Sequence, residues 1–226
     1  LSEIPRQWAR ILKTWSRANR VLKRTVYDKS CPEANDEYFL YQTLVGSYPL
    51  DVTEQAGYLD RLRSYLIKAT REAKTYTSWL KPDLDYEQAY LAFLSALFDS
   101  SPSNAFLETF RPFCQEIAEY GIWSSLSQVL IKIAAPGVPD FYQGTELWDF
   151  SLVDPDNRRP VDWTQRRAAL QEIRTAHAEQ GAAACARALL DRLHDGRIKL
   201  YLTWKVLELR REFETLFRDG DYLPLR

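Results

Sequence analysis

The residues best suited to chemistry lie in one irregular stretch, PGVPDFYQGTELWDFSLVDPDNRRPVD, from Pro136 to Asp162. Carboxylates and arginines crowd together there, and charge-assisted, often bidentate hydrogen bonds from such groups can fix the hydroxyls of a sugar. Aromatic side chains in the same stretch can supply flat faces for stacking. This combination suits a neutral, hydroxyl-rich ligand. The charged residues are Glu146, Asp149, Asp154, Asp156, Arg158 and Arg159, and the aromatic faces are Tyr142 and Trp148.

The same residues also have a purely structural interpretation. Asp and Arg can pair with each other and pin a loop, and Asp154 followed by Pro155 favours a turn. Spacing alone supports loop pinning and sugar binding about equally, so both interpretations stay open at this point.

A catalytic pair of acids is not assigned to this stretch. Retaining glycosidases need an acid/base and a nucleophile about 5–5.5 Å apart across the scissile bond, and inverting enzymes place the two farther apart. Asp154 and Asp156 lie two residues apart on one loop, so they would have difficulty flanking a sugar from opposite sides. The sequence therefore predicts no catalytic residue here.

The Cys and His residues indicate no metal site. Cys31, Cys114 and Cys185 lie far apart without ligand spacing, so we expect free, mostly buried thiols in a reducing compartment, the cytoplasm. His177 and His194 also have no metal-ligand partner at useful spacing, and we expect them as surface or capping residues. We therefore expect no metal and no cofactor.

Charge and hydropathy argue against two classes of partner. The 30 Lys and Arg residues and 31 Asp and Glu residues give a net charge of -1, which offers no electrostatic reason to expect nucleic acid or an anionic membrane. The apolar run from Val129 to Val138 is short and contains Lys132, so no membrane span is expected. The chain contains no Met and opens with LSEIPRQW, which suggests a piece of a longer protein.

The elements that must position the irregular stretch are mostly helices. Apolar residues recur at three- and four-residue steps through several windows, and Gly, Pro and Asn mark their ends. The predicted helices cover about residues 5–24, 36–46, 51–73, 86–97, 105–135 and 163–194, with a last one through Leu202 and Phe213 that ends before Arg218. Residues 27–36 are predicted as a loop, Asp51 and Glu54 as a capping box, and Pro112 and Gly121 as helix interruptions.

One segment departs from the helical period. GVPDFYQG, residues 137–144, is a short β-branched and aromatic run bracketed by glycines, which predicts a brief buried strand. The long irregular segment that follows is of a kind that is usually functional in a compact domain.

This strand and loop resemble the segment around the eighth barrel strand of α-amylase-superfamily enzymes. The sequences NDEYFLYQTLVGSYP, KATREAKTYTSW and DGRIKLYLTWKVLELRRE, with LFRDGDYLPL after them, extend the resemblance in the same order to the maltooligosyltrehalose synthases. The resemblance covers essentially the whole chain. The combination of motifs is specific to that family, whereas the strand motif alone indicates only the superfamily.

The resemblance implies a mainly α fold class in an incomplete (β/α)8 barrel. Residues 1–104 would form a helical insertion region, and residues 105–226 the end of the barrel with its eighth strand and closing helices. The family converts the reducing-end α-1,4 linkage of a maltooligosaccharide into an α,α-1,1 linkage by intramolecular transglucosylation. The implied partners are the maltooligosaccharide and the remainder of the parent chain, with no nucleic acid and no membrane.

The resemblance also implies roles for individual residues. Tyr142, Gln143 and Glu146 would lie at the barrel mouth, and Asp156, Arg158 and Arg159 in the loop that closes over it, all as substrate-binding residues. Lys74, Ser78 and Trp79 are weaker candidates, which a helix end with a core tryptophan explains about as well. The family's catalytic carboxylates lie on earlier strands, and the THD-type motif that carries the last of them is absent, so the isolated chain is expected to be inactive.

Two other interpretations remain. The chain could belong to another α-amylase-superfamily hydrolase or transglucosylase, which would release glucose and maltose without a trehalosyl product. It could instead be a helical protein-interaction module that docks through the basic face from Arg17 to Arg24.

Overall fold

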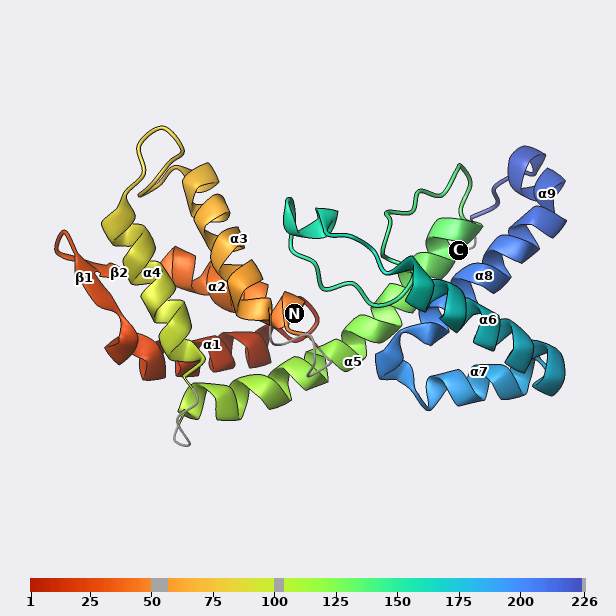
Figure 1. Ribbon diagram of the computed structural model, residues 1–226, viewed down its shortest axis with the longest axis horizontal. Coiled ribbons are helices and arrows are strands. Elements are labelled where there is room, and N and C mark those ends of the chain that lie inside the picture. The colour runs from red at the N-terminus through yellow and green to blue at the C-terminus, as the bar shows by residue number, and fades with distance from the viewer. Residues whose placement is uncertain (50–56, 100–103, 225–226) are drawn as a thin grey trace. The chain divides into compact units, whose positions relative to one another are not determined.

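The computed structural model describes residues 1–49, 57–99 and 104–224, and the chain divides into two compact units (Figure 1). Unit 1 comprises Leu1–Ala118 and Phe150–Arg158, and unit 2 comprises Glu119–Asp149 and Arg159–Arg226. Helices dominate both units, so the predicted mainly helical class is confirmed.

Unit 1 is a cluster of helices with one small hairpin. Trp15 is buried at its centre and packs edge-on against Phe106 and Phe110, with ring centroids 5.3 Å and 5.8 Å away. Its indole Nε1 donates to Thr109 Oγ1 at 2.9 Å, so the buried polar atom is satisfied. The elements are α1 Pro5–Asn19, η1 Arg20–Leu22, β1 Arg24–Val26, β2 Lys29–Cys31, α2 Ala34–Ser47, α3 Tyr58–Ala73, α4 Leu84–Leu97, the first part of α5 Ala105–Ala134, and η3 Asp156–Arg158.

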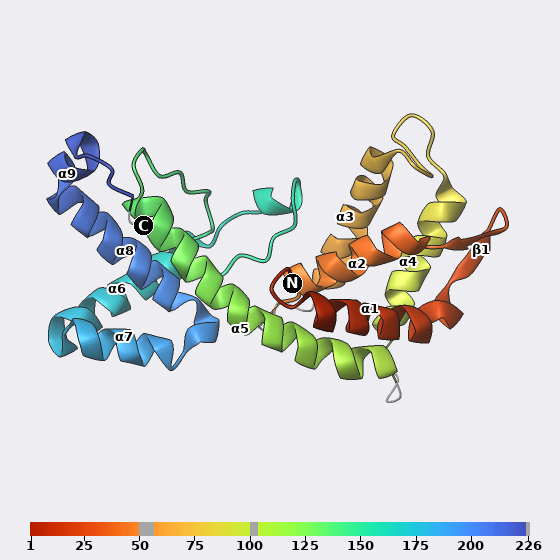
Figure 2. The ribbon, with the colours of Figure 1, turned by 180° about the vertical axis from the view of Figure 1, so that it is seen from behind.

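Unit 2 is built from α6, α7 and α8, which contact one another, together with the second part of α5 (Figure 2). Ile133, Ile173 and Cys185 are among its buried core residues. Its further elements are α6 Trp163–Gln180, α7 Ala182–Leu190, η4 Leu193–Asp195, α8 Arg197–Glu212 and α9 Glu214–Asp219. Cys31, Cys114 and Cys185 are all free and buried, as predicted.

The predicted strand at residues 137–144 is not formed. Among the described residues, the strands are β1 and β2, which pair with each other in antiparallel register. A strand needs a neighbour to accept and donate its backbone hydrogen bonds, and no described strand lies beside residues 137–144. This stretch is instead irregular, and its Val138 is almost fully exposed.

Four boundaries also differ from the prediction. The predicted loop at 27–36 contains the β1–β2 turn, where Tyr27 and Asp28 adopt positive φ values of 47° and 59°. Helix α5 continues through Pro112 and Gly121, because its buried face packs into both cores. Gly181, with φ of 83°, separates α6 from α7, and Phe213 separates α8 from α9. The predicted capping residues Asp51 and Glu54 lie outside the described residues.

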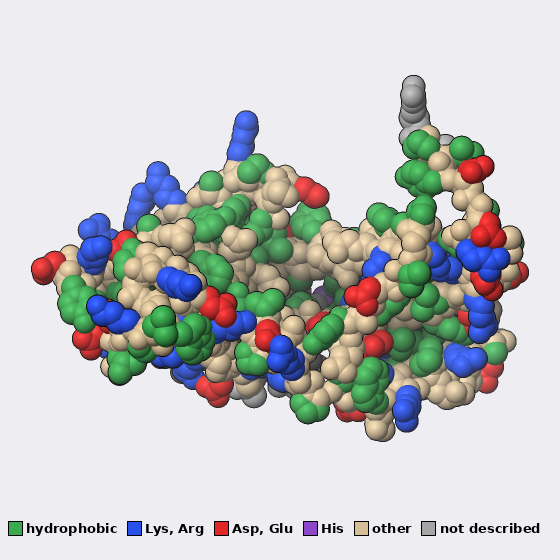
Figure 3. Space-filling model, turned by 90° about the horizontal axis from the view of Figure 1, so that it is seen from above, with side chains coloured by type: hydrophobic (Ala, Val, Ile, Leu, Met, Phe, Trp, Pro, Cys, Tyr) green, Lys and Arg blue, Asp and Glu red, His purple; other side chains and the backbone are tan. Residues whose placement is uncertain are grey.

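Charged side chains of both signs are interspersed over the face shown in Figure 3. This mixture is what a net charge of -1 leads one to expect. Over residues 1–49, 57–99 and 104–224, no helix combines the length and hydropathy needed to cross a bilayer.

Candidate functional site

The irregular segment is shared between the two units. Residues 137–149 and 159–162 belong to unit 2, and residues 150–158 to unit 1. The six candidate residues divide accordingly. Tyr142, Gln143, Glu146 and Arg159 lie in unit 2, and Asp156 and Arg158 lie in unit 1.

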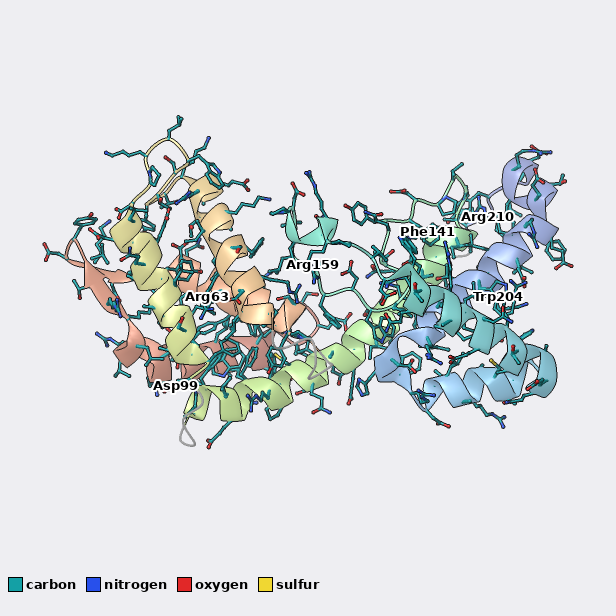
Figure 4. All side chains as sticks on the ribbon, in the orientation of Figure 1. Arg63, Asp99, Phe141, Arg159, Trp204 and Arg210 are labelled. Atoms are coloured by element: carbon teal, nitrogen blue, oxygen red, sulfur yellow. The ribbon has the colours of Figure 1, made fainter. Side chains whose placement is uncertain are left out.

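The start of the segment in unit 2 is held by Arg210 of α8. Its guanidinium donates to the carbonyl oxygens of Ile133 and Gly137, and to that of Ala135 at 3.1 Å. These carbonyls would otherwise be unsatisfied at the end of α5. Figure 4 labels Arg210 on α8 and Phe141 in the segment itself.

An open groove of about 460 Å³ lies beside this anchor within unit 2. It is lined mainly by Val138, Leu207 and Phe217 and by the arginines Arg210, Arg211 and Arg218. None of the six candidate residues lines it, so this groove is separate from the site that the sequence predicts.

Glu146 is fixed by an ion pair with Arg166 in the first turns of α6. Arg166 Nε donates to Glu146 Oε2 at 2.8 Å, and its Nη2 donates to the Gly144 carbonyl at 2.8 Å. The Arg166 guanidinium therefore binds the loop on both sides of Thr145, at Gly144 and at Glu146. Arg166 carries no signal in the sequence, because it lies on a helix twenty residues away from its partner.

A tight turn presents Tyr142 and Gln143 to solvent. Thr145 donates to the Tyr142 carbonyl through its backbone N–H at 3.3 Å and through its hydroxyl at 2.7 Å. Gly144 has φ of 91°, a conformation that few other residues accept. Tyr142 is 47% exposed, so this turn leaves its ring available as a stacking face.

Trp148 anchors the loop, and its ring is not the open stacking face that the sequence suggested. Its Nε1 donates to the Leu193 carbonyl at 2.7 Å. Lys199 is buried, donates to the Leu147 carbonyl at 3.1 Å and lies 5.7 Å from the centroid of the Trp148 ring. Burial lowers the pKa of Lys199, although the charges of Asp149 and Glu146 oppose this effect.

In unit 1, Asp156 ties the segment to α3. Its Oδ2 accepts from Arg61 Nη1 at 2.8 Å and from the Leu152 backbone N–H at 2.7 Å, and its side chain is only 8% exposed. Lys68, also on α3, donates to the Asp154 carbonyl. Two cations on one helix thus hold this turn.

Arg158 lies on the outside of the same turn. It pairs with Asp154, and its side chain is 70% exposed. Arg159, the next residue, lies at an exposed position and also has interactions with its surroundings. Figure 4 labels Arg159 in the irregular segment.

The pairs Glu146–Arg166, Asp156–Arg61 and Asp154–Arg158 show that acids and arginines pin this segment. Pinning and sugar binding are compatible, because the pins leave Tyr142, Gln143 and Arg158 exposed. The sugar-binding roles of the six candidate residues stay predictions. In the part of the chain that the structure describes, no group of three or more His, Cys, Asp and Glu side chains is arranged to hold a metal.

Comparison with known proteins identifies what the chain is similar to. Two proteins from strains of Mycobacterium tuberculosis, provisionally named maltooligosyl trehalose synthase, are 36% identical to it over 225 residues. The resemblance to the maltooligosyltrehalose synthases is confirmed. The chain is matched over 100% of its own length and spans 25%, a quarter, of the length of those relatives.

Solved structures agree with this result. A crystal structure of a maltooligosyl trehalose synthase has a TM-score of 0.80 at 35% identity, covering 100% of this chain and 28% of that one. Maltooligosyltrehalose synthase from Arthrobacter ramosus has a TM-score of 0.66 at 31% identity over 96% of this chain and 24% of that one. No protein-family profile matches the chain.

Proposed function

We propose that this chain is the glucan-holding part of a cytoplasmic isomerase, a glucan glucosylmutase of the α-amylase superfamily. That enzyme converts the reducing-end α-1,4 linkage of a maltooligosaccharide into an α,α-1,1 linkage by intramolecular transglucosylation. The observation that carries the proposal is the similarity over the whole chain to maltooligosyl trehalose synthases at 36% identity. Residues 1–104 are proposed as a helical insertion, and residues 105–226 as the end of the barrel.

In this proposal, catalysis and substrate binding are carried by different parts of the enzyme. The carboxylates that break and form the glycosidic bonds lie outside this chain, so the chain alone is inactive. Tyr142, Gln143 and Glu146 bind the substrate at the barrel mouth, and Asp156, Arg158 and Arg159 bind it from the closing loop. The released glucose must be held and water kept out, because water at the same position turns the enzyme into a hydrolase.

The geometry of the loop supports this assignment. Binding sites gain affinity when their groups are positioned in advance, and the ion pairs to Arg166 and Arg61 provide such positioning.

Product analysis of the full-length enzyme tests the proposal. With maltopentaose as substrate, we expect a product of unchanged mass that has lost its reducing end and carries a trehalose terminus. Release of glucose and maltose without that product would instead identify a hydrolase of the same superfamily.

A further inference from the structure

The loop between α3 and α4, residues 74–83, presents an aromatic surface outside the irregular segment. Trp79 is 55% exposed and its neighbour Leu80 is fully exposed. In Figure 1 this loop projects beyond the ends of both helices. Trp79 is therefore not a core residue, and about half of its surface is open to solvent.

Beneath Trp79 lies a fixed guanidinium. The Arg71 Cζ is 4.9 Å from the centroid of the Trp79 ring. Arg71 donates through Nε and Nη2 to the two carboxylate oxygens of Glu87, at 2.8 Å and 2.7 Å. Glu87 is only 5% exposed, and the hydrogen bond from Arg71 lowers its pKa. A bidentate pair to a buried carboxylate holds the guanidinium in one orientation.

The loop backbone is tied to the same carboxylate. Thr77 Oγ1 donates to Glu87 Oε1 at 2.5 Å and accepts from the Asp83 backbone N–H at 3.0 Å. Ser78 Oγ accepts from the Lys81 N–H at 3.0 Å. A large exposed ring thus sits on a preorganised support, which is unusual for a loop that does no more than connect two helices.

The groups around the ring match the surface of a sugar. Because the guanidinium covers one face of Trp79, its exposed area must come from the other face and the edge. Arg71 Nη1 finds no acceptor among the described residues, and the Ser78 hydroxyl still has its own hydrogen to donate. An aromatic face flanked by such donors stacks a pyranose ring and binds its hydroxyls.

Helix α3 connects this platform to the candidate site in unit 1. Arg61 and Lys68 hold the turn with Asp156, and Arg71 follows Lys68 by less than one helical turn. At a rise of about 1.5 Å per residue, Arg61 and Arg71 are about 15 Å apart along the helix. This distance corresponds to a few glucose units of an extended glucan.

We propose that Trp79 and Arg71 form an additional glucan-binding platform, which stacks a glucose ring of a long maltooligosaccharide away from the reacting end. The inference rests on the proposed function, because it assumes a maltooligosaccharide substrate. It predicts that affinity depends on chain length.

The test is the chain-length dependence of KM in the full-length enzyme. For Trp79→Ala, KM for maltoheptaose should rise about fivefold while kcat stays unchanged, since loss of one stacked ring weakens binding without touching the reacting atoms. KM for maltotriose should not change. Trp79→Phe, which keeps an aromatic face, should restore most of the affinity for maltoheptaose. Trp123→Ala, which removes a ring that is 53% exposed on α5, is the matched control and should leave both values unchanged.

Three outcomes would overturn the platform. These are equal KM changes for short and long chains, no change for either, or a change of oligomeric state with unchanged KM, which would indicate a protein contact. All three outcomes differ from a failure of the proposed function. In that case the wild-type enzyme itself would form no trehalosyl product.

Discussion

The two parts of the irregular segment are held in different ways. Residues 137–149 are attached to the core of unit 2 through Trp148 and Lys199, which bond to backbone carbonyls of Leu193 and Leu147. Residues 150–158 are attached to unit 1 by charges, through the Asp156–Arg61 pair on α3. The first part lies against its core through these two side chains, whereas the second is held chiefly by two cations of α3, Arg61 and Lys68. In the proposed function both parts present exposed side chains to the ligand, Tyr142 and Gln143 from the first and Arg158 from the second, but the two parts are supported by different contacts.

The largest loss of stability is expected from adding a side chain at Gly196, where the backbone packs closely against Trp148 in unit 2. A Cβ at Gly196 would lie 2.8 Å from the Trp148 backbone N, at a residue with φ of 74°. Gly196→Ala should therefore reduce the free energy of unfolding by about 2–4 kcal/mol, from left-handed backbone strain and overpacking together. Denaturant unfolding measures this change.

Gly121→Ala is the matched control for this substitution. Gly121 lies within α5 and a Cβ there meets nothing within 4 Å, so the same change should stabilise the protein by about 0.5–1 kcal/mol. If Gly196→Ala were tolerated as well as Gly121→Ala, the first part of the segment would not be fixed by its contact with η4.

A smaller loss is expected from breaking the anchor in unit 1. Arg61→Ala removes the guanidinium that pairs with the Asp156 carboxylate, whose side chain is 8% exposed. The expected loss is about 1–3 kcal/mol, because removing one partner of a buried ion pair costs more than the pair contributes. A double-mutant cycle with Asp156→Ala should show strong coupling, and additive effects would contradict the account of this anchor.

A weaker effect on stability, which depends on pH, is expected at Lys199 in unit 2. Burial places the pKa of Lys199 below its ordinary value of about 10.4. The unfolded chain then binds more protons than the folded one, so stability from this residue rises as pH increases from the lowered folded pKa towards about 10.4.

The measurement compares the wild type with Lys199→Met by urea unfolding from neutral pH to about pH 11. Taking the difference removes the contribution of the tyrosines common to both proteins. The wild type should gain stability relative to the variant as pH rises. A difference that is constant over this range would mean that the Lys199 ammonium is not destabilised by burial.

Local patterns in the sequence were sufficient to predict most helices, because the spacing of apolar residues within each segment shows the helical period. The strand at 137–144 was wrongly predicted, since a strand depends on a neighbour that local sequence does not reveal. The β1–β2 turn was missed because Tyr27 and Asp28 supply the positive φ values that Asn and Gly usually provide. Helix α5 passes through Pro112 because tertiary packing outweighs local propensity.

The acids and arginines of the candidate site were recognised from their types, but their partners were not. Arg61 lies 95 residues from Asp156, and Arg166 lies 20 residues from Glu146. Only the folded chain brings these side chains together. Trp148 illustrates the same limit, because its hydrogen bond to Leu193 converts an expected stacking face into an anchor.

The central claim, that residues 150–158 hold glucan and do not break bonds, is tested most directly by Arg158→Ala in the full-length enzyme. The Asp154–Arg158 pair is largely exposed, so the melting temperature should hardly change, with at most about 0.5 kcal/mol lost. Turnover should fall about tenfold or the product should shift towards hydrolysis, because a charged hydrogen bond to the sugar is lost. Arg167→Ala, at another exposed arginine, should change neither. A large loss of stability with normal turnover and product ratio would show that Arg158 only pins the loop.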